Sequence, residues 1–336
     1  MKFLSHSNGM HTVEKNKISK GRIFKNCIIF IALLIAFGFV SQIITNMVDN
    51  SRLKSRFKYV RIDGRKLEYK LKPEGDYTVV FDGALGADMY EWDEVCKTLE
   101  ENKVSTFTYN RRGYGFNDGT DVRTPEEQAK DLKLLLRKAG APEPYILVGE
   151  EYGSLVTTNF MNLYPDSVAG VVLVDPISEE KMQTNEFKDS IKGPYYRSSF
   201  EAVGSNFNLT ALLSKMGLTM ENKTFEDHIS GDELEEFNGL KNKKNYKQAV
   251  SNELGNLYNG ASNSQTAGLL GNKPLYLISN NEEDPIKKIG NSDYTTVYKE
   301  EINGSPLSQL DPDTIVNGVN SVIKDAKKLA KKQQAS

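Results

Sequence analysis

Tyr145-Ile-Leu-Val-Gly-Glu-Glu-Tyr-Gly-Ser-Leu155 is the stretch that decides the fold. Its apolar first half predicts a short buried strand, the glycines predict a tight turn, and the remainder predicts a helix. A nucleophile elbow has this form, because G-x-S-x-G presents a serine where a strand turns into a helix. Gly149 and Gly153 occupy the two glycine positions, but the serine position holds Glu151.

The chain on both sides of this stretch alternates between predicted strands and predicted helices. Asp63-Gly64 predicts a hairpin turn between two strands, and Thr124-Pro125 with Glu127 predicts a helix start with a capping box. Such alternation is typical of parallel βαβ units, so we expect an α/β fold. Strands are expected at 57–62, 66–71, 77–81, 104–109, 145–148, 170–175, 274–279 and 294–298.

Composition excludes some classes of function. The 336 residues carry 43 basic and 45 acidic side chains, a formal net charge of -2. This balance does not favour a nucleic-acid partner, and none is expected. The two cysteines, Cys27 and Cys96, exclude a disulfide framework.

An uncharged apolar run begins at Cys27 and predicts a single transmembrane anchor at residues 27–48. Basic residues dominate the preceding segment 1–26, which we therefore place in the cytoplasm, with the main domain outside the cell. Residues 49–56 are polar and are interpreted as a stalk. The alternative is a cleaved signal peptide with Ala36-Phe37-Gly38 as its cleavage site.

Three parts are expected after the stalk. The α/β core begins at 57–176 and resumes at 273–336, where a basic tail closes the chain. Residues 177–272 are polar and only weakly amphipathic, and they are too many for a loop in a compact sheet. We interpret them as an inserted helical cap.

Three stretches together resemble the α/β-hydrolase superfamily, in particular its lipase, esterase and haloperoxidase-like members. They are Phe81-Asp-Gly-Ala-Leu-Gly-Ala-Asp-Met-Tyr-Glu-Trp92, Tyr109-Asn-Arg-Arg-Gly-Tyr-Gly-Phe-Asn-Asp-Gly119 and the elbow stretch. The resemblance implies a mostly parallel sheet flanked by helices, with the 177–272 segment as its cap. It also implies an oxyanion loop and pocket at Asp82, Gly83, Ala84 and Tyr152.

The same resemblance implies where a nucleophile, an acid and a histidine would stand. The nucleophile position holds Glu151, and the acid position corresponds to Glu283 or Asp284. The histidine position, counted back from Pro312, holds Ser305. This member is therefore degenerate at two of the three positions.

Histidine is scarce in this chain. His6 and His11 precede the predicted anchor, and His228 lies in the predicted cap, where we expect it on the surface. No histidine stands at a triad position, so no catalytic residues are expected.

Glu151 can be interpreted in more than one way. Related dehalogenases and epoxide hydrolases form an ester on an aspartate at this position, but hydrolysis of that ester also needs the missing histidine. We instead hypothesise that the Glu151 carboxylate fills the oxyanion hole. The helix dipole and the N–H donors there are expected to favour its ionised form.

Other charged residues near the elbow have simpler interpretations. We expect Glu150 to face solvent, Asp82 to cap its loop, and Arg111-Arg112 to support the structure. A Ca²⁺ site formed by Asp82, one of these glutamates and the 283–284 acids is the alternative. No metal and no cofactor are expected.

Two functions remain open. The first is a non-catalytic, membrane-anchored protein that binds a small molecule, a lipid or a protein partner at the outer membrane surface. The second is an active esterase-like or lipase-like hydrolase with a non-standard constellation, for instance through Ser154 or Ser305. Ser154 is expected inside the elbow helix, and neither serine has an obvious base.

Overall fold

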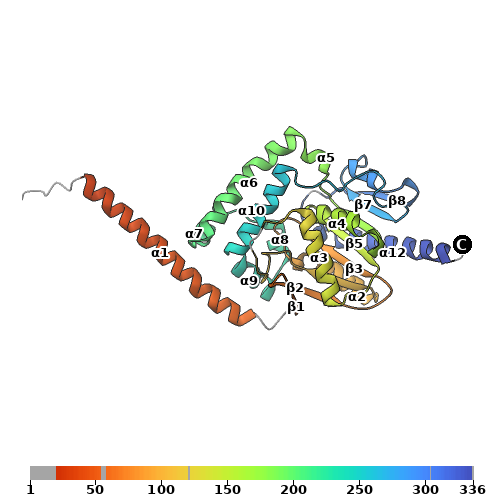
Figure 1. Cartoon of the computed structure of the whole chain (residues 1–336), viewed down its shortest axis with the longest axis horizontal. Coiled ribbons are helices and arrows are strands. Elements are labelled where there is room, and N and C mark those ends of the chain that lie inside the picture. The colour runs from red at the N-terminus through yellow and green to blue at the C-terminus, as the bar shows by residue number, and fades with distance from the viewer. Residues whose placement is uncertain (1–19, 54–57, 120–121, 303, 335–336) are drawn as a thin grey trace, which may run out of the picture.

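The computed structural model describes residues 20–53, 58–119, 122–302 and 304–334. Most of the predicted cytoplasmic segment 1–26 and the end of the predicted stalk 49–56 lie outside the described residues. Figure 1 shows the long helix α1, a body built on a sheet, and a group of helices beside it.

Within the described residues, eight strands form one sheet in the order β1-β2-β4-β3-β5-β6-β7-β8. β2 pairs antiparallel with β1 and with β4, and every other pairing is parallel. The strands are β1 (Lys58–Ile62), β2 (Arg65–Lys72), β3 (Thr78–Asp82), β4 (Ser105–Tyr109), β5 (Tyr145–Glu150), β6 (Val168–Val174), β7 (Leu275–Ser279) and β8 (Thr295–Lys299).

Helices cover both faces of the sheet. α2 (Asp93–Glu101) and α12 (Pro312–Gln334) pack on one face, and α3 (Pro125–Ala139) and α4 (Tyr152–Leu163) pack on the other. Successive residues of a strand point to opposite faces, so Val80 and Leu147 enter one core cluster while Val79 and Val148 enter the other. This explains why the central strands are apolar without alternation.

The start of α3 confirms its sequence signal. The Thr124 side chain accepts a hydrogen bond from the Glu127 N–H, and the Glu127 side chain accepts one from the Thr124 N–H. Pro125 occupies the first turn, and Gly140 ends the helix in the left-handed conformation.

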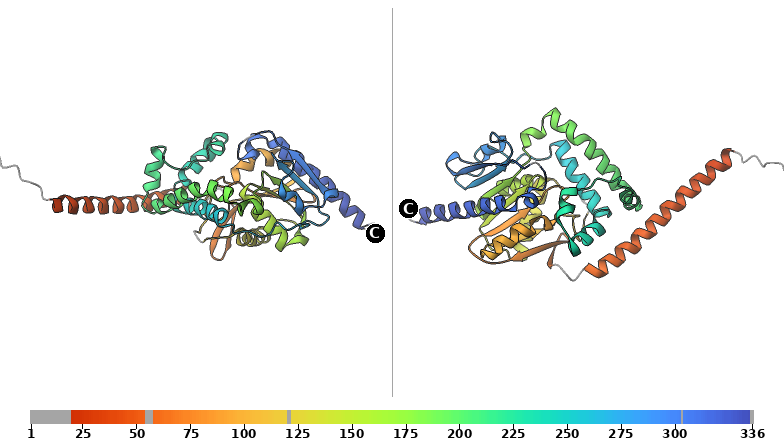
Figure 2. Two further views of the ribbon diagram at one scale, coloured as in Figure 1. Left: turned by 90° about the horizontal axis from the view of Figure 1, so that it is seen from above. Right: turned by 180° about the vertical axis from the view of Figure 1, so that it is seen from behind.

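The segment between β6 and β7 is helical, as Figures 1 and 2 show. α6 and α10 pack along each other, and the shorter helices surround them. The bounds are α5 (Glu179–Met182), α6 (Asn185–Ser205), α7 (Leu209–Lys215), α8 (Lys223–His228), α9 (Gly231–Leu240) and α10 (Lys244–Asn259). Short elements elsewhere are η1 (Met89–Trp92), η2 (Pro165–Ser167), η3 (Pro285–Ile289), η4 (Ser292–Tyr294) and α11 (Leu307–Leu310).

α1 runs from Lys20 to Leu53 and therefore continues into the segment that was predicted to be a stalk. Among the helices of the described residues, none combines the length and the apolar character that a membrane crossing requires, and the predicted span 27–48 gains no support there. α1 passes beside α7 (Figure 1 and the right-hand view of Figure 2). The Asn208 side chain donates a hydrogen bond to the Ser41 hydroxyl at 3.2 Å.

Candidate functional site

The turn between β5 and α4 has the geometry of a nucleophile elbow. Glu151 connects strand and helix with φ 44° and ψ -110°, a backbone conformation that residues other than glycine seldom adopt. A Cβ atom on Gly153 would lie 2.1 Å from the Asp82 carbonyl oxygen, and one on Gly149 would lie 2.8 Å from the Gly153 carbonyl oxygen. The two glycines are therefore required by close backbone approach, as their spacing predicted.

The Glu151 carboxyl points toward the oxyanion loop and toward Ser305. Burial raises the pKa of Glu151, and hydrogen bonds from the Ser305 side chain and the Leu85 backbone act against this rise. The negative charge of Asp175 raises it further. The donors therefore favour the ionised form, as expected, but loss of hydration outweighs them and the pKa is raised overall. Two positions far apart in the sequence, 151 and 305, do lie together.

The structure separates the two alternatives for the acid position. Glu283 is exposed and forms an ion pair with Lys287 on the surface. Asp284 is buried, and it accepts hydrogen bonds from the Ser279 hydroxyl at 2.9 Å and the Ile286 N–H at 3.0 Å. The negative charge of Asp284 also raises the pKa of Asp175, so Asp284 lies near Asp175, which in turn acts on Glu151.

No imidazole reaches this region in the described part of the chain, where His228 is the single histidine. His228 ends α8 and is exposed, as predicted, and its Nδ1 lies 2.7 Å from the Thr224 carbonyl oxygen. Even if a serine stood at the nucleophile position, no histidine of the described residues could accept its proton.

The oxyanion loop is held by buried charged groups. Asp82 receives hydrogen bonds from Arg111 Nη1 at 2.6 Å and from the Tyr109 hydroxyl at 2.5 Å. The Ala84 N–H donates to Glu91 Oε1 at 3.0 Å, and a Cβ atom on Gly83 would collide with that same oxygen at 1.9 Å. Asp82 thus orients an arginine instead of capping its own loop, which corrects the sequence-based interpretation.

A family comparison matches these features. The model of the family described as "alpha/beta hydrolase fold" matches residues 77–293, which include the oxyanion loop, the elbow and the helices between β6 and β7. The chain belongs to the α/β-hydrolase family.

Sequence relatives cover only parts of the chain. It is 29% identical over 106 residues to the uncharacterized protein YqjL of Bacillus subtilis (strain 168), covering 31% of this chain and 42% of the relative. It is 28% identical over 166 residues to the probable transporter efuK of Hormonema carpetanum, covering 45% of this chain and 23% of the relative. The chain thus spans less than half the length of the curated relatives it matches.

Solved structures of similar fold cover most of the chain. The epoxide hydrolase CorEH aligns with a TM-score of 0.62 at 15% identity, over 80% of this chain and 98% of that one. A thermophilic esterase from Thermogutta terrifontis aligns with a TM-score of 0.58 at 15% identity, over 80% and 97%. At such low identity these likenesses show the fold alone.

In this α/β-hydrolase chain, Arg111 connects the oxyanion loop to the helices above it. Its Nε and Nη2 donate to the two carboxylate oxygens of Glu253 on α10, at 2.7 and 3.0 Å. The Tyr114 hydroxyl donates to Glu253 at 2.6 Å. Burial acts to lower the pKa of Arg111, but Glu253 and Asp82 outweigh it, so the guanidinium stays charged. The structural role predicted for this arginine is confirmed.

Tyr152 fills space above the elbow. Its hydroxyl donates to Gln128 at 2.9 Å and accepts from the Asn256 side chain of α10 at 2.8 Å, and its ring lies 5.1 Å from the Arg111 guanidinium. Sequence reasoning missed Glu253 and Asn256, although the helical spacing of Tyr246, Val250 and Leu257 marks the buried face of α10 and could have placed both polar residues on it.

Glu150 does not face solvent, which corrects another expectation. It is fully buried and accepts hydrogen bonds from the backbone N–H groups of Leu307 and Ser308. Burial raises its pKa to about 8, against the opposing effect of these donors. Glu150 and Asp82 therefore have separate partners, and within the described residues no group of three or more His, Cys, Asp or Glu could hold a metal ion.

Ser154 lies inside α4, as predicted. Its hydroxyl donates to the Glu151 carbonyl oxygen at 2.5 Å and accepts from the Ile177 N–H at 3.1 Å. The side chain is buried and engaged on both sides, so it does not face a substrate.

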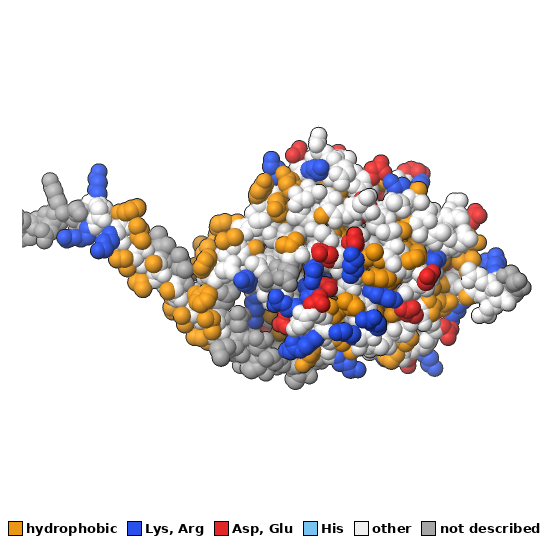
Figure 3. All heavy atoms as spheres, viewed as in Figure 1, with side chains coloured by type: hydrophobic (Ala, Val, Ile, Leu, Met, Phe, Trp, Pro, Cys, Tyr) orange, Lys and Arg blue, Asp and Glu red, His pale blue; other side chains and the backbone are white. Residues whose placement is uncertain are grey.

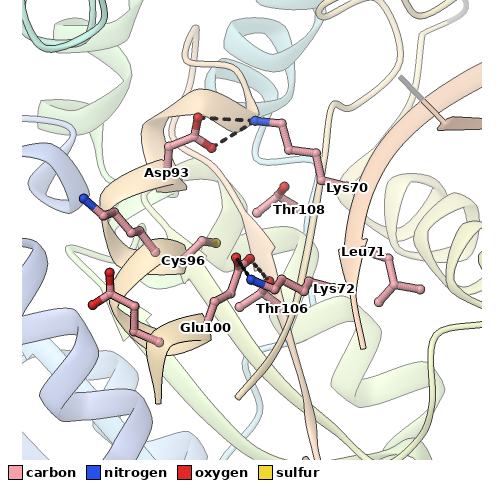
Figure 4. Close-up of a pocket in the computed structure, with 10 residues that line it drawn as sticks. Lys70, Leu71, Lys72, Asp93, Cys96, Glu100, Thr106 and Thr108 are labelled. Carbon is pink, nitrogen blue, oxygen red and sulfur yellow. Dashed lines mark hydrogen bonds and ion pairs between the residues drawn. The ribbon is translucent and has the colours of Figure 1, made fainter. Parts of the chain in front are cut away.

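A small cavity of about 50 Å³ lies beside the site and is lined by Asp175, Ser279, Glu300 and Gly304, among others. A larger one, of about 510 Å³, lies between α2 and the strands β2 and β4 (Figure 4). Two of its three lysines form ion pairs, Lys70 with Asp93 and Lys72 with Glu100, and Lys97 is the third. None of the predicted site residues lines the larger cavity, which is therefore unrelated to the elbow.

Proposed function

We propose that this chain is a non-catalytic member of the α/β-hydrolase family that acts by binding a partner at a membrane. The observation that carries the proposal is the position of the Glu151 carboxyl, which lies near enough to the Leu85 backbone and the Ser305 side chain for both to act to lower its pKa. A carboxyl in this position occupies the donors that would stabilise an oxyanion in acyl transfer. It also adds negative character where negative charge would have to develop.

The arrangement lacks the other requirements of serine hydrolysis as well. Acyl transfer needs a nucleophile that can transfer its proton to a base. Ser154 is engaged by backbone groups on both sides, and Ser305 faces a carboxyl rather than an imidazole. These contacts argue against the alternative of an active hydrolase that uses either serine.

The binding partner is a small molecule, a lipid or another protein. Small-molecule sites usually measure about 300–1,000 Å³, whereas the cavity beside the elbow measures about 50 Å³. Space above the elbow is filled by Tyr152 and the Arg111–Glu253 pair. At the elbow these features disfavour a small molecule, and we propose a lipid or a protein that is recognised by the outer surface.

We propose further that residues 27–48 attach the protein to the membrane, with the N-terminus in the cytoplasm and the main domain outside. The uncharged run from Cys27 to Val40 supports this, as does the preceding cluster of basic residues. Along α1, the apolar side chains of Phe30, Leu33 and Phe37 are exposed and have no core of the same chain around them.

A covalent probe tests the absence of catalysis. We expect the full chain in detergent to show no labelling by a fluorophosphonate and no turnover of short esters. Glu151→Ser combined with Ser305→His serves as the matched control, because it restores a nucleophile and a base at the family positions. Labelling of this double variant would show that the probe can reach the elbow.

The competing function has a distinct outcome. Labelling of the wild-type chain that persists in Glu151→Ala but disappears in Ser154→Ala or Ser305→Ala would identify an active serine. Ester turnover with the same dependence would overturn the proposal.

A further inference from the structure

The cavity between α2 and the strands β2 and β4, which we name the α2 groove, has the size of a small-molecule site (Figure 4). Its volume is about 510 Å³, and small-molecule sites usually measure about 300–1,000 Å³. Lys70 and Lys72 of β2 stand opposite Thr108 and Thr106 of β4 in the sheet register. These four residues line the groove on the sheet side, and α2 lines it on the other. No residue of the elbow lines it, so the groove is a separate candidate site.

The sheet side of the α2 groove is polar. Phe107, between the two threonines, enters the core on the opposite face of the sheet. The Thr106 hydroxyl donates to Glu100 Oε1 at 2.6 Å. Thr108 is only 3% exposed, and its hydroxyl forms no hydrogen bond within the described residues. A hydroxyl withdrawn from bulk water without a partner costs free energy, so a ligand that hydrogen-bonds to Thr108 would be favoured here.

The charges that line the α2 groove balance each other. Cys96 adds none, because burial and the neighbouring acids raise the pKa of its thiol well above the usual range. Figure 3 shows a similar mixture over the body of the molecule, where basic and acidic side chains are interspersed. A ligand of one sign would therefore meet as many like charges as opposite ones, whereas a zwitterion can use both. The charged lining residues are Lys70, Lys72, Lys97, Asp93, Glu100 and Glu101.

The ion pairs of the groove leave their charges available to a ligand. Lys70 and Asp93 are 3.1 Å apart, with side chains 40% and 35% exposed. Lys72 and Glu100 are also 3.1 Å apart, with side chains 55% and 25% exposed. Pairs this exposed contribute little to stability, so a ligand can replace one partner at small cost. Lys97 is exposed and forms no ion pair within the described residues.

The end of the groove at Asp93 is the more negative one. Partial burial raises the pKa of Glu233 on the cap helix α9, and the negative charge of Asp93 raises it further, so the two carboxyl groups lie close together. Asp232 acts in the same direction, and Lys70 acts against them. A second cation at this end would relieve the repulsion between the carboxyl groups.

We propose that the α2 groove binds a zwitterion of dipeptide size, with its ammonium group beside Asp93 and its carboxylate beside Lys72. Glu233 adds an acceptor at the first end, and Lys97 adds a donor toward the second. Lys70 and Lys72 stand two residues apart on β2, which is about 7 Å along a strand. The charged groups of one α-amino acid share a single carbon atom and are too close together, whereas those of a dipeptide match this separation. The site is independent of the function proposed for the elbow.

Calorimetric titration of the full chain in non-ionic detergent tests the proposal with alanyl-alanine as the probe. We expect the dipeptide to bind. N-acetyl-alanyl-alanine lacks the ammonium group and alanyl-alanine amide lacks the carboxylate, so each should bind about tenfold or more weakly. Alanine should also bind more weakly, because it cannot reach both ends.

Substitutions at the two ends should give a crossed pattern that a general loss of structure would not produce. Asp93→Asn should weaken alanyl-alanine about tenfold without further weakening the N-acetyl form, and Lys72→Gln should do so without further weakening the amide. Glu233→Gln, on a different helix, should act like Asp93→Asn and guards against one misfolded variant. The matched control is Lys130→Gln, which breaks an exposed pair with Glu126 outside the groove and should leave binding unchanged.

Three results would overturn the proposal. The first is no binding of alanyl-alanine at millimolar concentration to a chain whose circular dichroism shows that it is folded. The second is binding that Asp93→Asn and Lys72→Gln both leave unchanged, because the dipeptide would then lie elsewhere. The third is an N-acetyl form that binds as tightly as the free dipeptide, because the groove would then select an anion.

Discussion

Arg111 offers the sharpest test of how the core and the cap are held together. Its guanidinium is 5% exposed and binds two carboxylates that are each 2% exposed, Asp82 at 2.6 Å and Glu253 at 2.7 Å. Arg111→Met removes the charge but keeps an apolar chain of similar length. Both carboxylates then stay buried without a cation. This costs more unfolding free energy than replacing all members of a buried ion pair by apolar side chains.

The expected loss follows from that geometry. Removing one partner of a buried ion pair costs about 3–5 kcal/mol of unfolding free energy, because an uncompensated charge remains. The matched control is Lys70→Met, which breaks a 3.1 Å pair with Asp93 whose side chains are 40% and 35% exposed. Exposed pairs contribute about 0–1 kcal/mol, so the control should change little.

Urea unfolding of the full chain in non-ionic detergent, followed by circular dichroism, measures both variants. A second comparison uses Arg111→Met together with Glu253→Gln, which removes one of the stranded charges. The double variant should be less destabilised than the sum of the two single variants, because residues of one network do not act independently. If Arg111→Met stays within about 1 kcal/mol of the wild type, the buried network does not hold the cap as we infer.

Other perturbations follow from the same structure. Burial raises the pKa of Glu150 from 4.5 to about 8; the folded state therefore keeps a proton that the unfolded chain loses. The free energy of unfolding should thus fall as pH rises through that window, by up to about 1.4 kcal/mol per pH unit for this group, and Glu150→Gln should flatten the fall in urea titrations. Gly153→Ala should destabilise by about 1–3 kcal/mol or more, because its Cβ meets a backbone oxygen at 2.1 Å. Gly239→Ala, with open space around it, should be neutral or stabilising by up to about 1 kcal/mol in the same assay. Gly38→Val should separate α1 from Phe207 while keeping α1 apolar, because the Cβ atom would lie 2.1 Å from the Phe207 carbonyl oxygen. We expect the variant to lose cross-linking between a pair of cysteines placed on the two sides of this contact. Unchanged cross-linking would contradict the close approach.

Local signals made the fold predictable. The glycines around Glu151 and the capping box at Thr124 each act within a few residues, and the structure places both as expected. The neighbourhood of Glu151 and Ser305 was also predictable, because the order of strands in this fold brings both loops to one edge of the sheet. These inferences needed only short-range geometry and a known strand order.

Buried charge was not predictable in the same way. Glu150 and Glu151 are adjacent in the sequence, yet one binds backbone N–H groups of Leu307 and Ser308 while the other faces Ser305. Two neighbouring glutamates ordinarily indicate a solvated turn, and nothing local shows that distant N–H groups lie behind one of them. The Arg111–Glu253 pair has the same character, because the sequence of α10 marks its buried face but not which distant cation lies opposite Glu253.

The balance of charge at the elbow argues that restoring two residues would not restore an efficient hydrolase. Glu151→Ser and Ser305→His return a nucleophile and a base, but Asp175 remains, with burial raising its pKa and Asp284 raising it further. An oxyanion at the elbow would develop close to Asp175, whose carboxylate form would repel it. Labelling by a fluorophosphonate therefore tests whether the elbow is correctly placed, whereas we expect sustained ester turnover to require also that Asp175 be replaced, with Asp284 kept to orient the new histidine. A double variant that turned over esters rapidly with Asp175 in place would contradict this electrostatic account.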